Sequence, residues 1–185
     1  MHGKRTGSIV LIVLYCLYIL LIFSNSAQTA SESSQRSLRI VQQLNSLLFG
    51  GADIISEHLI RKAAHFTEFA GLGTLGYACV KRIISAFLTY RPSEACSISH
   101  SAAHSAALPA TQSTAYSAAL IAVFSAAASS VFFGLLTALT DETIQLFVEG
   151  RSGQITDVWI DFAGVCFGTA AAILCKLFKH MAFGL

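Results

Sequence analysis

Long apolar runs, separated by shorter polar segments, dominate the pattern of this chain. Four of these runs are apolar enough to be considered membrane spans, at about residues 8–23, 63–80, 115–139 and 158–176. A membrane-spanning helix needs about 20 mostly apolar residues, and the second and fourth runs reach that length only with polar residues at one end. The pattern predicts an all-α membrane protein built as a four-helix transmembrane bundle.

A different pattern separates the first two runs. Residues 24–37 are polar and are expected to form a loop. Residues 38–51, LRIVQQLNSLLFGG, then carry an apolar stripe at helical spacing: Ile40, Val41, Leu44, Leu47 and Leu48. This stripe predicts a short extracytoplasmic amphipathic helix that lies on the outer membrane surface. A lid that folds over a site is the alternative interpretation.

The first apolar run also has features of a signal peptide, because the basic residues of HGKR precede it. Cleavage of a signal peptide requires small residues at positions −1 and −3. After Ala30 the −3 residue is Gln28, and after Ala27 it is Asn25. We therefore expect a retained helix.

The composition supports a single integral membrane domain over residues 1–185. Hydrophobic residues make up 54% of the chain, charged residues make up 12%, and the mean hydropathy is +0.63. These values are far from those of an ordinary soluble domain. The net charge of +2 is spread thinly along the chain, so we expect no nucleic-acid partner.

The segment between the second and third runs is rich in alanine and serine and is predicted to be a loose cytoplasmic loop over residues 82–114. Four of the five cysteines fall within apolar runs, and Cys96 falls in this loop. An odd number of cysteines, none of them in the expected external loops, argues against a disulfide framework. We expect them to be small packing residues.

Basic residues give the expected orientation. With a cytoplasmic N-terminus, seven basic residues lie on the cytoplasmic side and five on the other. This small excess agrees with the positive-inside rule and predicts a multi-pass plasma (inner) membrane protein with both termini in the cytoplasm. The first set is Lys4, Arg5, Lys81, Arg82, Arg91, Lys176 and Lys179, and the second is Arg36, Arg39, Arg61, Lys62 and Arg151.

This topology brings three polar segments to the extracytoplasmic membrane face. They are RKAAHFTEF (61–69), DETIQ (141–145) and RSGQITDVWID (151–161). Glu68 and Asp161 each lie about one turn inside an apolar run, where an ionisable group is costly and indicates function by default. The three segments therefore predict one shared polar site.

Helical spacing places these side chains on particular faces. One stripe runs down the second helix at spacings i, i+3, i+7 and i+10: His58, Arg61, His65 and Glu68. Another runs down the fourth helix at i, i+4, i+7 and i+11: Asp157, Asp161, Gly164 and Gly168. On the third helix, Asp141 and Gln145 share a face beside Glu142. The two glycines are expected to let a neighbouring helix approach closely.

The polar residues also admit a purely structural interpretation. His65, Glu68 and Arg151 would then pair with Asp157 or Asp161 and pin the helices together. However, small residues alone can hold a membrane bundle, without charges placed in lipid. We therefore favour a functional site.

Two segments carry a resemblance to a known family. KAAHFTEFAGLG (62–73) and DETIQLFVEGRSGQITDVWIDFAGVCFG (141–168) resemble the signature segments of the VanZ-like membrane protein family, and FSNS (23–26) resembles its serine-containing motif. The family-like positions are Lys62, His65, Glu68, Asp141, Glu142, Gln145, Arg151, Asp157, Asp161, Gly164 and Gly168. Three positions depart from the pattern: Phe69 stands for a usual tyrosine, Glu149 for a common proline, and Asp161 where asparagine often appears.

The resemblance implies an envelope-associated membrane protein, and it links the family's namesake to resistance against the lipid-bearing glycopeptide teicoplanin. It implies no settled biochemical activity. The residues themselves leave two main functions open. In the first, a polar pocket binds a lipid headgroup or a lipidated envelope ligand through Lys62, Asp141, Glu142, Gln145 and Arg151.

In the second, the protein is an enzyme that acts on a lipid-linked envelope substrate. The candidate acid/base residues are His65, Glu68, Asp157 and Asp161, with Arg151 stabilising negative charge. A proton-coupled transporter is disfavoured, because the polar groups gather at one face rather than at the bilayer midplane. A divalent metal held by His65 and carboxylates is conceivable, but no ligand spacing is diagnostic of one, so we expect no metal or other cofactor.

Overall fold

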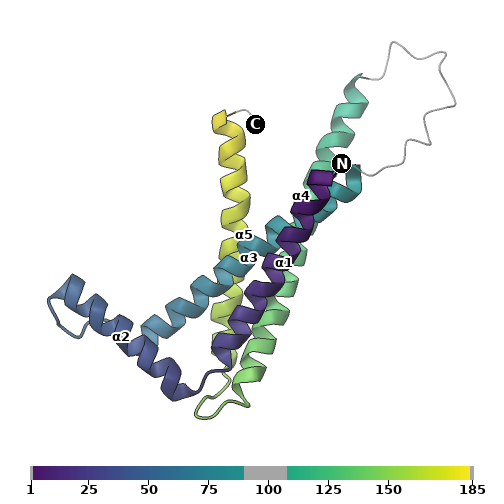
Figure 1. The fold of residues 1–185 in the computed structure, drawn as a ribbon. Coiled ribbons are helices and arrows are strands. Elements are labelled where there is room, and N and C mark those ends of the chain that lie inside the picture. Colours follow the sequence, from purple (N-terminus) through teal and green to yellow (C-terminus); the bar gives the residue numbers. More distant parts are fainter. Residues whose placement is uncertain (1, 90–107, 184–185) are drawn as a thin grey trace, which may run out of the picture.

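The computed structural model describes residues 2–89 and 108–183, and these residues form five helices and no strand. The helices are α1 (His2–Ser26), α2 (Ala30–Phe49), α3 (Glu57–Thr89), α4 (Leu108–Gln145) and α5 (Ile155–Phe183). Figure 1 shows α1, α3, α4 and α5 packed as a bundle, while α2 extends from one end of it as a separate arm. The all-helical prediction is confirmed.

Three helical segments of the described chain are long and apolar enough to cross a membrane: Thr6–Ser26, Ser117–Gln145 and Ile155–Ala182. They correspond to the first, third and fourth predicted spans. The second predicted span lies within α3, which carries more charge and does not reach the same apolar threshold. The count of four spans therefore stays a prediction.

The distribution of polarity in the bundle is the reverse of that in a soluble protein. Large apolar side chains such as Leu17, Phe124 and Phe178 are exposed, whereas Asp141, Asp161 and other polar residues are buried. An apolar exterior matches lipid as the surrounding solvent, and buried ionisable groups in such a bundle face its interior or a cavity. This arrangement supports the membrane assignment independently of hydropathy.

Helices α3 and α5 cross in the bundle (Figure 1), and two glycines of α5 let it approach α3 closely. A Cβ atom at Gly164 would collide with the Phe66 carbonyl oxygen, and one at Gly168 would collide with the Ala70 carbonyl oxygen. The Thr74 hydroxyl also donates to the Gly168 carbonyl at 3.0 Å across this contact. Close approach through small residues, supported by an interhelical hydrogen bond, is typical of membrane helices. This contact fixes the position of α5 against α3.

The start of α2 was predicted too late. The expected loop over residues 24–37 is mostly helical, because α1 continues to Ser26 and α2 begins at Ala30. Thr29 and Glu32 form a capping box, in which each side chain accepts from the other residue's backbone N–H. This motif starts a helix even where the following residues are polar. The other end of α2 stops at Gly50, whose φ of 60° suits glycine.

The contact face of α2 also differs from the predicted apolar stripe. The buried residues are Ser37, Val41 and Asn45, whereas Leu47 and Leu48 are exposed. Asn45 bonds both backbone groups of Ile55 and so fixes the turn between α2 and α3. Within the stripe, Val41 thus packs on the protein, while Ile40, Leu47 and Leu48 remain exposed. The position of the exposed part on a membrane surface stays a prediction.

The loop predicted over residues 82–114 is shorter at both ends, because α3 continues to Thr89 and α4 begins at Leu108. Residues 90–107, with Cys96, lie outside the described part of the chain. The four cysteines of the described part are free thiols: Cys16, Cys79, Cys166 and Cys175.

Candidate functional site

A polar pocket of about 130 Å³ lies at the end of the bundle where α3 begins and α4 joins α5. Its lining comes from the first turns of α3 and α5, the last residue of α4 and the α4–α5 turn. The lining residues are His58, Arg61, Lys62, His65, Gln145, Gly150, Arg151, Ser152, Gln154, Asp157, Ile160 and Asp161. The three polar segments of the sequence thus meet in one place, as their pattern predicted.

Lys62 and Asp157 connect α3 to α5 at this pocket. The Lys62 ammonium donates to the Asp157 carboxylate. Both side chains are about one-third exposed, so water screens the pair. A partly exposed ion pair contributes little to stability, typically about 0–1 kcal/mol. Its main effect is to hold two charged side chains in position at the pocket.

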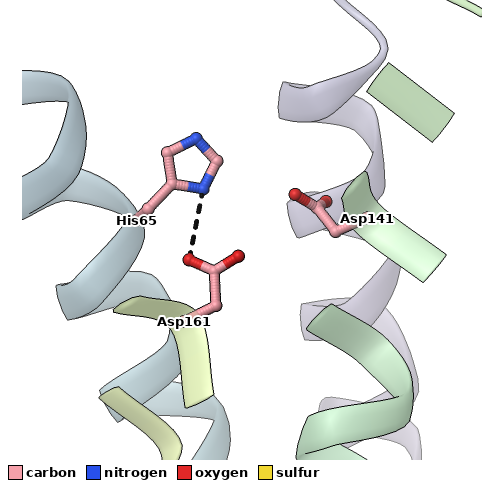
Figure 2. A group of neighbouring side chains, drawn as sticks. All are labelled: His65, Asp141 and Asp161. Carbon is pink, nitrogen blue, oxygen red and sulfur yellow. Dashed lines mark ion pairs between the residues drawn. The ribbon is translucent and has the colours of Figure 1, made fainter. Parts of the chain in front are cut away.

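Deeper in the bundle, His65, Asp161 and Asp141 point toward one another from three different helices (Figure 2). The His65 Nδ1 atom lies 3.6 Å from the Asp161 Oδ1 atom, which is an ion-pair distance rather than a hydrogen bond. Both aspartates are 0% exposed. The sequence predicted that His65 or Glu68 would approach Asp157 or Asp161, and the His65–Asp161 contact agrees with that geometry.

Gln145 and Glu142 join α4 to the start of α5. The Gln145 amide donates to Asp141 at 3.0 Å and to Glu142 at 3.1 Å. The other Glu142 oxygen accepts from the backbone N–H of Gln154 at 2.8 Å. Gln145 therefore sets the orientation of the Asp141 carboxylate, while Glu142 positions the segment that enters α5.

Arg151 ties the α4–α5 turn to the junction between α1 and α2. Its guanidinium donates to the Ser33 hydroxyl at 2.8 Å and to the Ser26 carbonyl at 3.4 Å. Burial lowers the pKa of Arg151, and the positive charge of Arg61 lowers it further, while Asp141 and Glu142 raise it. Because an arginine stays protonated in proteins, Arg151 brings a fixed positive charge to the pocket without a direct carboxylate partner among the described residues.

Glu68 does not join the pocket. Its carboxylate accepts a hydrogen bond of 2.8 Å from the Asn25 amide of α1, and its backbone carbonyl accepts one from the Tyr18 hydroxyl. The other three members of the predicted stripe on this helix do line the pocket. Glu68 therefore lies where α1 packs on α3, with no direct contact to Asp157 or Asp161, although its charge still acts on Asp161.

Arg61, His58 and Asn25 were not among the candidate site residues. Arg61 and His58 line the pocket, and their helical spacing with His65 was a signal that could have included them. Asn25 lies in FSNS, a segment that the family resemblance had already singled out. Ser26 of the same segment accepts from Arg151 through its carbonyl. The motif at the end of α1 therefore contacts two residues of the predicted site, Arg151 through Ser26 and Glu68 through Asn25.

The pocket has two chemically distinct parts. Its outer part carries basic side chains that can bind an anionic group. Its inner part is lined by His65 and Asp161, and the buried carboxylate of Asp141 lies close to both, just beyond the lining. These three groups can accept protons or bind a cation.

Comparison with known proteins gives one result for this chain. The family model described as VanZ/LLP1 matches residues 9–178, which include every residue of the pocket. No curated protein and no solved structure shows a significant match.

Proposed function

This chain belongs to the VanZ/LLP1 family, and on that premise we propose that its pocket binds the anionic headgroup of a membrane lipid or of a lipid-linked envelope molecule. Family membership and three apolar helices indicate a membrane protein, in a family whose name is linked to glycopeptide resistance. A teicoplanin-type antibiotic carries a lipid and a polar part, so binding of such a molecule belongs to the same proposal.

The basic lining of the pocket is the observation that carries this proposal. Arg61, Lys62 and Arg151 face the same space. Of these, only Lys62 pairs with a carboxylate among the described residues. A guanidinium matches phosphate and carboxylate oxygens geometrically and is less strongly hydrated than an ammonium. Two guanidinium groups without a carboxylate partner therefore favour an anionic ligand.

The apolar surroundings of the pocket suit a ligand that is anchored in lipid. Trp159 is 65% exposed and Phe147 is 86% exposed, and both lie within a few residues of the pocket lining. Exposed tryptophan is enriched where a membrane meets water, at the depth of the lipid headgroups. A pocket at this depth would meet a headgroup without drawing the lipid out of the bilayer.

The His65–Asp161 contact favours a second candidate, an enzyme that performs acid/base chemistry on the same class of ligand. His65 would act as the general base, and Asp161 would orient it and stabilise its charged form. Conversion of a bound lipid-linked molecule to a product of different mass would establish this activity. Binding without conversion would leave the binding function alone.

Native mass spectrometry of the protein in mild detergent tests the headgroup proposal. We expect one anionic lipid or lipid-linked phosphate to remain bound per chain. Arg61→Gln should raise the Kd at least about tenfold and so lower the bound fraction, because a charge-assisted hydrogen bond contributes about 1.5–3 kcal/mol. Arg39→Gln is the matched control, since Arg39 is an exposed guanidinium on α2 that does not line the pocket. Equal retention in both variants would contradict the proposal.

We further propose that the pocket faces the extracytoplasmic side and that both termini are cytoplasmic. A hollow at the opposite end of the bundle is lined by Lys81, Arg82 and Lys176, which agrees with a cytoplasmic position of these basic residues. The expected result is labelling of Gln35→Cys and Ser152→Cys by a membrane-impermeant maleimide in intact cells, with Lys179→Cys protected.

These labelling experiments need a background in which all five native cysteines are replaced. The three positions are exposed, so folding does not hide them from the reagent. Permeabilised cells should label all three variants and serve as the control for accessibility. If intact cells label position 179 but neither position 35 nor position 152, the orientation is opposite to the one proposed.

A further inference from the structure

The deepest part of the pocket holds buried polar atoms that nothing in the described chain satisfies. Neither carboxylate oxygen of Asp161 has a hydrogen-bond partner among the described residues, and the same holds for the Asp141 Oδ1 atom and the His65 Nδ1 atom. The Ser26 side chain lies beside Asp141 but leaves Asp161 unpartnered. Native proteins rarely leave buried polar atoms unsatisfied, because each costs free energy. These atoms therefore indicate a missing partner.

The charges make this arrangement more costly. Whenever both carboxylates are ionised, these two groups, each 0% exposed, repel each other without the hydration that water would provide. A hydrogen-bond donor from the protein would relieve this, and Gln145 does donate to the Asp141 Oδ2 atom. No described residue donates to Asp161. The partner that neutralises both carboxylates at once is a doubly charged cation.

The His65–Asp161 distance fits shared coordination of one ion, and Asp141 lies close enough to complete the ligand set by a small movement of its side chain. One ligand atom of each residue can be chosen so that all three lie within 4.8 Å of one another. Two ligands of a transition metal, each about 2.1 Å from it, lie about 3.0 Å apart at a right angle and about 4.2 Å apart on opposite sides. The His65–Asp161 separation of 3.6 Å falls in this range. It is too long for a hydrogen bond but suitable for two ligands of the same metal.

We propose that His65, Asp141 and Asp161 bind a divalent metal ion at the inner end of the pocket. One imidazole nitrogen and two carboxylates form a mixed N/O ligand set, which favours Zn²⁺ or Mn²⁺ over Ca²⁺ and Mg²⁺, ions that prefer oxygen alone. Three protein ligands leave further coordination positions for water or ligand. His65 and Asp161 also line the pocket, so those positions lie toward the basic groups.

Gln145 orients one of the proposed metal ligands without binding the ion itself. Its hydrogen bond to Asp141 Oδ2 fixes the carboxylate so that Oδ1 stays available, as the outer partners of metal ligands commonly do. The sequence left a metal held by His65 and carboxylates conceivable but without support, because the three ligands come from three helices and no local spacing reveals them. The proposed metal site also gives a role to Asp161, where the family resemblance more often has asparagine.

The test is metal binding by the purified full chain, prepared in mild detergent without a polyhistidine tag. The protein is stripped with EDTA, exchanged into metal-free buffer and titrated with Zn²⁺ or Mn²⁺. We expect one ion per chain by elemental mass spectrometry, and a rise in Tm of about 5 °C when the ion is present at roughly 100 times its Kd. Asp161→Asn and Asp141→Asn should each weaken binding at least about 100-fold, because even the loss of an outer partner costs about 10–100-fold.

Two matched variants show whether a loss of metal affinity is specific to the three proposed ligands or follows from any change of charge in the pocket. Asp157→Asn removes a carboxylate one helical turn from Asp161, and His58→Gln removes the other pocket imidazole. Both should retain one ion per chain with affinity within about threefold of wild type. If a carboxylate variant aggregates during purification, His65→Gln takes its place, because it also removes a proposed ligand but lies at a partly exposed position.

Absence of a bound ion and of any Tm shift at millimolar Zn²⁺ and Mn²⁺ would overturn the proposal, and the carboxylates would then share protons instead. Equal loss of metal in Asp157→Asn and Asp161→Asn would also overturn it. Headgroup binding is measured separately through Arg61→Gln, which contributes no metal ligand. A negative result for metal binding therefore leaves the proposed headgroup function standing. A negative result for headgroup binding likewise leaves the proposed metal site standing.

Discussion

Replacement of Gly168 by alanine is expected to lower the free energy of unfolding by about 3 kcal/mol, the upper end of the usual cost of overpacking. The added Cβ would collide with the Ala70 carbonyl oxygen. This obstacle is backbone, which cannot rotate away as a flexible side chain can, so α5 must shift along its contact with α3. Because residues near the pocket lie on both helices, this shift would also disturb the site.

The measurement is thermal unfolding of the variant in the detergent used for the wild type. A loss of this size corresponds to a fall in Tm of about 6–12 °C for a chain of this length. Ala170→Leu is the control, because residue 170 lies on the same helix but is exposed; this variant should leave the Tm within about 2 °C. A Gly168→Ala variant as stable as the control would show that α5 is not packed on α3 as described.

Asp161→Asn is expected to have the opposite effect on the metal-free protein. Asparagine keeps the shape of the side chain but cannot carry the negative charge that Asp161 places near Asp141 when both are ionised. Replacement of a buried ion pair by neutral groups of similar volume is often stabilising, by about 1–4 kcal/mol, and removal of a repulsive buried charge should act in the same direction. In the presence of EDTA, the Tm of Asp161→Asn should therefore exceed that of the wild type by several degrees.

Asp157→Asn provides the comparison on the same helix. Asp157 pairs with Lys62 in a partly exposed position, so its loss should change stability by less than about 1 kcal/mol, and in the unfavourable direction. The signs for the two aspartates thus differ. If Asp161→Asn instead lowers the Tm by several degrees in EDTA, Asp161 is part of the scaffold, and the functional interpretation of the inner pocket fails.

Helix starts illustrate how local signals can be misjudged. The polar letters of residues 24–37 suggested a loop, although the capping box of Thr29 and Glu32 was already present in them. This capping signal is local, and in the structure it outweighs the polarity of the residues that follow it. Val41 and Asn45 show the opposite case. Which face of α2 meets α3 depends on the turn that Asn45 makes with Ile55, and helical spacing cannot reveal that contact.

The sequence by itself determined the helical class, the membrane character, the family and the convergence of polar segments at one end of the bundle. These properties follow from local patterns: the length of apolar runs, the spacing of Gly164 and Gly168, and the order of the signature residues. Hydrophobic exclusion and helix geometry act along the chain, so they can be inferred without knowledge of the packing.

Only the tertiary structure decided which polar side chains meet. The rotation of each helix, set by the close contact of α5 with α3, directs Asp161 toward His65 and Asp141 and leaves Asp157 to Lys62. The same packing pairs Glu68 with Asn25, and Glu68 does not line the pocket. The candidate metal ligands come from three helices that are far apart in sequence, and their distances depend on helix rotations that no spacing along one helix encodes.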